Sequence, residues 1–166
     1  MASIFISLGS NIQPEHYLWQ GLHDLAQQFD ALTLSSVYES EAVGFDGGNF
    51  LNMVVAAETS LPVSEVVSLF KTIEAAHGRL PSSQKFSSRT LDIDLLLYDD
   101  LVCQEPVELP RAEITENAFV LQPLAEIAAT RVHPLTGKNY QTLWQAYSKP
   151  QRLWVVEFDW PPQVSQ

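Results

Sequence analysis

The chain has 166 residues, about the length of one domain. Its 9 basic residues against 20 acidic ones give a formal net charge of −11, which argues against non-specific nucleic-acid binding and against adhesion to an anionic membrane. No apolar run approaches the ~20 residues of a membrane-spanning helix. The single cysteine, Cys103, cannot by itself form an internal disulfide or a zinc cluster. We therefore expect a monomeric, cytoplasmic protein with one domain over residues 1–166 and neither nucleic-acid nor membrane partners.

The first part of the chain predicts a strand followed by a helix. Residues 3–8 form a short apolar run, and the turn-forming sequence Gly9-Ser10-Asn11 ends it. After Pro14, apolar residues recur at spacings of three and four, which is typical of one face of an amphipathic helix: Leu18, Leu22, Leu25 and Phe29.

Two more strands and a second helix are predicted next. Residues 33–38 and 50–58 are rich in strand-forming side chains, and a glycine-containing loop over 40–49 separates them. Pro62 can open a helix that Gly78 ends. Its buried stripe consists of Val66, Leu69, Phe70 and Ile73.

A polar loop over 79–90 then leads into an apolar strand over 91–98. The order strand, helix, strand, strand, helix, strand is typical of a ferredoxin-like α+β sandwich. The remainder predicts additional C-terminal helices and a short extra strand. We expect extended segments over 101–110 and 153–158, and helical turns over 116–129 and 143–147.

Two aspartates on the last strand of this core are the first candidate site. Side chains alternate along a strand, so Asp92 and Asp94 should share a face, while Ile93, Leu95 and Leu97 should pack against helices on the other. Carboxylates in so apolar a strand are costly to desolvate unless they are neutralised. Mg²⁺ neutralises such pairs well, typically together with substrate phosphates. A solvated pair at a sheet edge is the alternative.

Basic and aromatic residues give two further candidates. On this acidic chain, five of the nine basic residues fall within 41 positions, which suggests a local anion site: Lys71, Arg79, Lys85, Arg89 and Arg111. Arg79 could bind phosphate or only stabilise a helix C-terminus. Phe50 and Asn52 share a strand face and suit a flat, hydrogen-bonding heterocycle, although a core phenylalanine beside a backbone-bonded asparagine fits the same spacing.

Taken in order, these segments resemble the 6-hydroxymethyl-7,8-dihydropterin pyrophosphokinase family over about residues 3–130. The matching motifs are Leu8-Gly9-Ser10-Asn11, Phe50-Leu51-Asn52, Glu74 through Gly78-Arg79, Arg89 through Asp94, and Phe119 with Gln122-Pro123-Leu124. The resemblance implies a ferredoxin-like fold. It also implies transfer of diphosphate from ATP to the pterin hydroxymethyl group, with release of AMP, in folate biosynthesis.

The resemblance also assigns roles to residues. It implies that Asp92 and Asp94 hold two Mg²⁺ ions and that Arg79 and Arg89 assist phosphate transfer. Glu74 and Leu95 match positions that line the nucleotide pocket, and we expect the basic residues Lys85 and Arg111 on the same ATP side. Residues around the pterin would be Val43, Phe50, Asn52, Phe119 and Phe86, and loop 79–90 would act as a lid.

The chain departs from the family pattern mainly on the ATP side. Pro81 and Asn117 stand where arginines are common, and Arg111-Ala112 replaces a usual histidine and aromatic residue. We hypothesise that the Mg²⁺ and pterin sites are intact, while ATP binding is weaker or differently built, with Arg111 replacing one missing contact. The alternatives are a degenerate relative that binds pterins without kinase activity, and a ferredoxin-like interaction domain.

Overall fold

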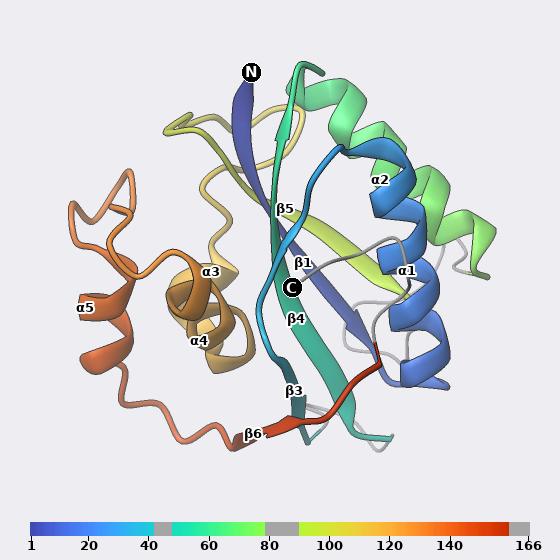
Figure 1. Cartoon of the computed structure of the whole chain (residues 1–166). Helices are drawn as coiled ribbons and strands as arrows, with labels where there is room; N and C mark the ends of the chain where they lie inside the picture. Colours follow the sequence, from blue (N-terminus) through green and yellow to red (C-terminus); the bar gives the residue numbers. More distant parts are fainter. Residues whose placement is uncertain (42–47, 79–89, 160–166) are drawn as a thin grey trace.

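The computed structural model describes residues 1–41, 48–78 and 90–159 (Figure 1). Its antiparallel sheet has the strand order β5 (Asp92–Tyr98), β1 (Ala2–Ser10), β4 (Phe50–Thr59), β3 (Val37–Ser40), β6 (Leu153–Val156). A short strand, β2 (Thr33–Leu34), also pairs with β4. The order β5-β1-β4-β3 confirms the predicted ferredoxin-like α+β sandwich.

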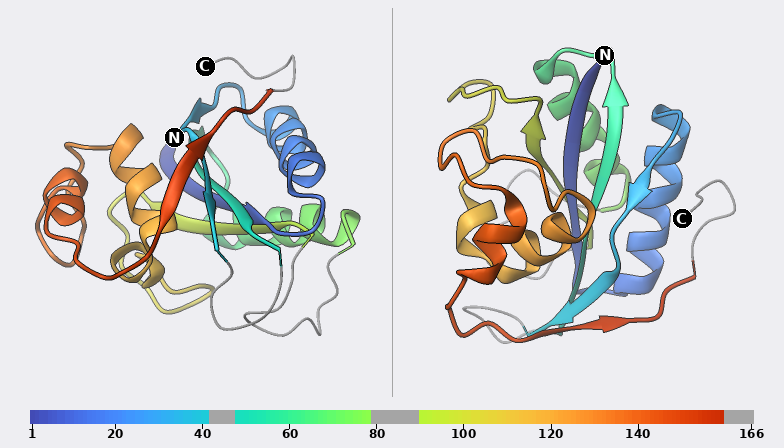
Figure 2. Two further views of the ribbon diagram at one scale, coloured as in Figure 1. Left: turned by 90° about the horizontal axis from the view of Figure 1, so that it is seen from below. Right: turned by 60° about the vertical axis from the view of Figure 1, so that its left-hand side comes forward.

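Helices cover both faces of this sheet (Figures 1 and 2). On one face, α1 (Pro14–Gln28) and α2 (Val63–Ala76) bury a core with alternate residues of the strands, including Ile4, Ile6 and Leu8 of β1. On the other face, Phe5, Val54 and Leu96 pack against the C-terminal helices. These are α3 (Glu113–Glu116), α4 (Ala118–Ile127) and α5 (Tyr140–Gln145).

The sequence signals for the ends of the first two helices are confirmed. Pro14 occupies the first turn of α1, after Gln13 in a left-handed conformation with φ 44°. α2 begins directly after Pro62. It ends before Gly78, whose φ of 90° is a conformation that favours glycine.

The predicted strand over 33–38 is interrupted, because two serines divert its hydrogen bonds. The Ser35 hydroxyl accepts the Val54 N–H at 2.9 Å, so a side chain replaces the backbone acceptor there. The Ser36 N–H turns to the Glu126 carboxylate of α4 instead. Two separate strands, β2 and β3, result.

The prediction that Leu97 shares a face with Ile93 and Leu95 is wrong. The pairing of β5 with β1 shifts register between Phe5 and Ile6, so β5 carries an extra residue there. After this bulge Leu97 joins Leu96 in the core beneath the C-terminal helices, whereas Ile93 and Leu95 pack against α1 and α2. The side chains before the bulge, including both aspartates, keep the predicted alternation.

The C-terminal segment belongs to the same sheet. β6 pairs antiparallel with β3 (Figure 2) and confirms the predicted late strand. Phe158 beyond it packs against the α1–α2 core. The predicted extended segment over 101–110 contains only an isolated bridge between Cys103 and Leu109. Within the described residues, no helix has both the length and the apolar character needed to cross a membrane.

One carboxylate ties the end of α4 to the sheet. Glu126 accepts hydrogen bonds from the Ser36 hydroxyl at 2.8 Å and from the Tyr38 hydroxyl at 2.7 Å. Tyr38 is buried. We therefore predict that Glu126→Ala lowers the free energy of unfolding by about 1–2 kcal/mol, because a buried hydroxyl loses its partner. Urea denaturation measures this, with the exposed Glu58→Ala as the control; equal effects of both substitutions would contradict the prediction.

Candidate functional site

The candidate site begins with a row of residues that crosses the sheet. The register pairs Asp92 of β5 with Gly9 of β1, Gly9 with Asn52 of β4, and Asn52 with Tyr38 of β3. Directly paired residues point to the same face of an antiparallel sheet. This is the face that the C-terminal helices cover, because the neighbouring side chains of Leu8, Met53 and Ile93 pack on the α1–α2 side.

Gly9 lets the Asn52 amide lie across the middle of this row. A Cβ on residue 9 would be 2.6 Å from Asn52 Oδ1, closer than real contacts allow. Asn52 is buried, and its Nδ2 donates to the Ser40 hydroxyl at 3.4 Å, a long hydrogen bond. A glycine here therefore preserves one orientation of a buried amide that both donates and accepts.

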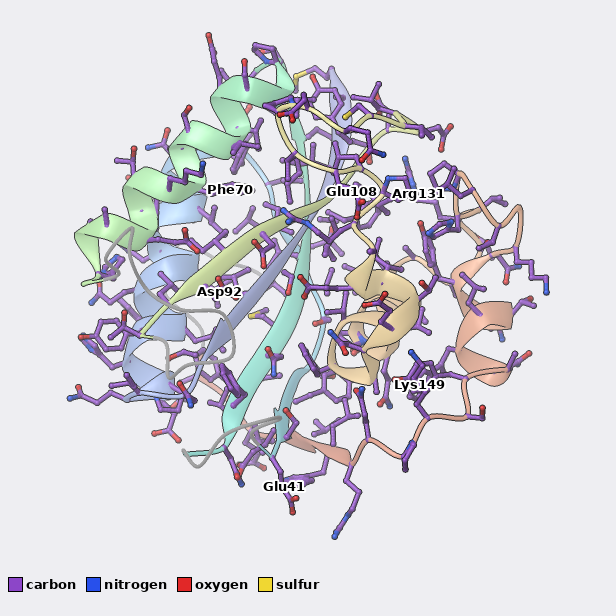
Figure 3. The ribbon with its side chains drawn as sticks, turned by 180° about the vertical axis from the view of Figure 1, so that it is seen from behind. Glu41, Phe70, Asp92, Glu108, Arg131 and Lys149 are labelled. Atoms are coloured by element: carbon purple, nitrogen blue, oxygen red, sulfur yellow. The ribbon has the colours of Figure 1, made fainter. Side chains whose placement is uncertain are left out.

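Asp92, labelled in Figure 3, and Asp94 share the same face and are half-buried, although β5 is an edge strand. Arg111 lies beside the pair, with Nη2 3.7 Å from Asp94 Oδ1 and Nε donating to the Leu95 carbonyl at 3.2 Å. In the parts of the chain that the structure describes, no group of three or more His, Cys, Asp or Glu side chains is arranged to hold a metal. The arrangement offers a pair of carboxylates, to which a substrate could add ligands.

The pKa of Asp94 reflects its burial and the charged side chains around it. Burial raises its pKa to about 7, and repulsion from Asp92 adds to the increase. The Arg111 guanidinium opposes it, while Glu113 and Glu74 contribute further in the upward direction. Negative charge at Asp94 is thus poorly compensated by the residues that the structure describes, and a bound cation would relieve it.

The predicted aromatic residues lie on the same side of the sheet. Phe50 alternates in phase with Asn52 along β4 and is half-buried. Phe119 lies in the first turn of α4 and is partly buried against the core of that face. The structure therefore brings Phe50, Asn52, Phe119 and the two aspartates to one face of the sheet.

Glu74 and Leu95 occupy different positions. Glu74 extends from the last turn of α2 to the edge of the sheet, where Oε2 accepts the Ile93 N–H at 2.8 Å. The Leu95 side chain is buried in the α1–α2 core, on the opposite face from the aspartates. Only the Leu95 backbone remains near Arg111.

Five predicted site residues lie outside the described residues: Val43, Arg79, Lys85, Phe86 and Arg89. Conversely, no sequence pattern pointed to Tyr38, which is the register partner of Asn52, or to Glu126, which accepts a hydrogen bond from the Tyr38 hydroxyl. No local pattern marks such residues, because strand register and helix docking depend on contacts distant in sequence.

The raised pKa of Asp94 predicts a specific dependence of stability on pH. Because its folded-state pKa of about 7 exceeds the usual carboxyl value of about 3.9, the native state binds more protons between these values. Its contribution to stability is therefore complete below about pH 4 and is lost as pH rises through about 7. We predict that Asp94→Asn stabilises the ligand-free protein at pH 8 relative to wild type. The variant should also show a smaller decrease in the free energy of unfolding between pH 5 and pH 8.

Chemical denaturation at the two pH values measures this change. The exposed Asp30→Asn, which removes the same charge elsewhere, should keep the wild-type decline. Identical pH profiles for the Asp94 and Asp30 variants would contradict the prediction.

Comparison with known proteins identifies the family. The family model for 7,8-dihydro-6-hydroxymethylpterin-pyrophosphokinase matches residues 5–129. The curated 2-amino-4-hydroxy-6-hydroxymethyldihydropteridine pyrophosphokinases of Aquifex aeolicus and Bacillus subtilis are 35% and 40% identical over 141 and 129 residues. These matches cover 83% and 74% of this chain and 88% and 76% of the relatives.

Solved structures agree on the fold. The crystal structure of wild-type Plasmodium falciparum HPPK-DHPS with pterin and p-hydroxybenzoate matches 87% of this chain with a TM-score of 0.68. At 14% identity this likeness concerns the fold alone, and the chain spans 42% of that structure's length. The family model and the sequence relatives together establish that the chain belongs to the 7,8-dihydro-6-hydroxymethylpterin pyrophosphokinase family.

Proposed function

We propose that this protein transfers the terminal diphosphate of ATP to the hydroxymethyl oxygen of 6-hydroxymethyl-7,8-dihydropterin, releasing AMP, as a step of folate biosynthesis. Family membership supports this proposal over a pterin-binding relative without kinase activity. The observation that carries it is the row Asp92–Gly9–Asn52. It sets a carboxylate and a pterin-reading amide on one face, about 10 Å apart across two strand spacings. A bicyclic heterocycle with a hydroxymethyl arm can bridge such a gap.

The carboxylate pair fits the divalent cations that the family implies. Oxygen ligands from one or two carboxylates plus substrate phosphates are the usual Mg²⁺ environment. The raised pKa of Asp94 reflects an acidic cluster that the Arg111 guanidinium does not neutralise. Asp92 and Asp94 would therefore hold Mg²⁺, two ions by the family pattern. Bound there, Mg²⁺ would offset charge on the phosphate oxygens during transfer.

The other end of the row would bind the pterin. The Asn52 amide, buried and fixed above Gly9, can both donate to and accept from a heterocycle edge. Phe50 from β4 and Phe119 from α4 would supply flat apolar contacts. Val43 and Phe86 complete the proposed pterin set from the sequence pattern.

The phosphate contacts are proposed from sequence and charge. Arg79 and Arg89 would neutralise the transferring phosphates, and Lys85 and Arg111 would bind ATP together with the backbone near Glu74 and Leu95. Phosphoryl transfer of this kind needs mainly alignment of the hydroxymethyl oxygen with the bond that breaks. We further propose, from composition, that the protein is cytoplasmic and monomeric.

The direct test is a turnover assay. Incubation with ATP, Mg²⁺ and 6-hydroxymethyl-7,8-dihydropterin should yield equal amounts of AMP and pterin diphosphate, measured by anion-exchange chromatography. Release of ADP and phosphate in place of AMP, or pterin binding without any transfer, would contradict the proposal.

Asp92→Asn tests the cation site. We predict that AMP formation falls about a hundredfold or more while the fold is retained, because one anionic ligand is lost. Thermal denaturation should also change, since Mg²⁺ with a non-hydrolysable ATP analogue should stabilise wild type and the exposed control Asp30→Asn but not this variant. Full turnover by Asp92→Asn would exclude the assignment.

Gly9→Ala tests the pterin end of the row. The added methyl group would displace the Asn52 amide, so we predict a rise of about tenfold in KM for the pterin with little change in KM for ATP. Ser3→Ala, on the same strand and face but far from Asn52, is the matched control. Steady-state kinetics with each substrate varied in turn measures both constants, and an unchanged pterin KM would count against the role of Asn52.

A further inference from the structure

The segment after α5 makes side-chain contacts with the start of α4. Gln151 Oε1 accepts the Ala118 N–H at 2.7 Å, and Gln151 Nε2 lies 3.4 Å from both the Glu116 carbonyl and Asn117 Oδ1. The same carbonyl accepts the Tyr147 hydroxyl at 2.7 Å. Lys149, labelled in Figure 3 beside this helix, adds a longer contact of 3.4 Å to that carbonyl. Three side chains of the segment 147–151 thus contact residues 116–118 at the start of α4.

Gln151 performs the capping that the helix itself does not supply. Asn117 is the N-cap residue of α4, yet its side chain makes no capping hydrogen bond. The first amide of the helix, at Ala118, is one of the groups that a helix leaves without an internal partner. Because Gln151 accepts from this amide, a residue 33 positions away helps to hold the conformation of the first turn.

The residue after Ala118 is Phe119, which we have proposed as a pterin contact. Its backbone lies in the turn that Gln151 caps, and its ring is only partly buried against the core. The other end of α4 is held separately, through Glu126 and Tyr38. The position of Phe119 is therefore set close to the capped end of the helix.

We propose that Gln151 is a positioning residue for pterin binding, which acts by fixing the first turn of α4 and with it the Phe119 ring. This inference rests on the proposed function. It assigns a role to the segment beyond residue 129, where the family match ends. A purely structural role, in which Gln151 only anchors the C-terminal segment, would lower stability without a selective effect on either substrate.

Three variants separate these roles. Gln151→Met keeps the size of the side chain but removes both hydrogen-bonding groups. Gln151→Glu keeps an acceptor for the Ala118 amide, and a carboxylate is favourable at a helix N-terminus. Gln145→Met makes the same substitution at an exposed glutamine of α5 and is the matched control.

We expect Gln151→Met to raise KM for the pterin about five- to tenfold, with KM for ATP changed less than about twofold. Gln151→Glu should restore most of the pterin KM, and Gln145→Met should match wild type. An unchanged pterin KM in Gln151→Met, or equal rises in both KM values, would overturn the inference.

Amide hydrogen exchange in the ligand-free protein makes this test independent of turnover. Gln151→Met should increase exchange at Ala118 and Phe119 more than Gln145→Met does. Unchanged exchange there overturns the inference even if the enzyme is active. If Gln151→Met increases exchange at these amides but the wild-type protein forms no AMP, the capping role of Gln151 is supported. The proposed function, and with it the pterin role, is then rejected.

Discussion

The pairing register of β1 with its two neighbours is the constraint on which the rest of the site depends. Gly9 stands between Asp92 and Asn52, so both strands must align on that one residue for the carboxylate and the amide to share a face. A slip of one residue in either pairing would turn one of the two side chains to the α1–α2 core. The apolar residues that alternate with them make such a slip costly, because it would also remove Ile93 or Met53 from the α1–α2 core. Core packing thus enforces the geometry of the site.

The same face concentrates negative charge that the described part of the chain balances only in part. Asp94 is surrounded by Asp92, Glu74 and Glu113, and Arg111 is the cation that contacts it among the residues described. A guanidinium at 3.7 Å with additional backbone hydrogen bonds can hold such a cluster together in the free protein. The residual imbalance is suited to a site that accepts cations and polyphosphate together, since each ligand supplies charge that the other lacks.

Local sequence patterns predicted much of this arrangement. The periodicity of α1, the glycine that ends α2 and the alternation of Asp92 and Asp94 are local properties, and the structure agrees with each. The bulge that turns Leu97 to the other face could not be predicted, because it arises from a mismatch between two strands about 90 residues apart in the sequence. The contacts of Glu126 and Gln151 were also missed, since ordinary polar residues acquire such roles only through the docking of distant segments.

The edge strand β5 shows how groups next to the site also occupy backbone positions at the margin of the sheet. Unpaired amides and carbonyls on an edge strand can recruit a strand from another molecule. Here the Ile93 amide is bonded to the Glu74 carboxylate, and the Leu96 carbonyl accepts the Arg111 amide. These groups of the same chain thereby block the addition of another strand at the edge beside the carboxylates. At the opposite margin of the sheet, β6 carries the exposed side chains of Trp154 and Val155.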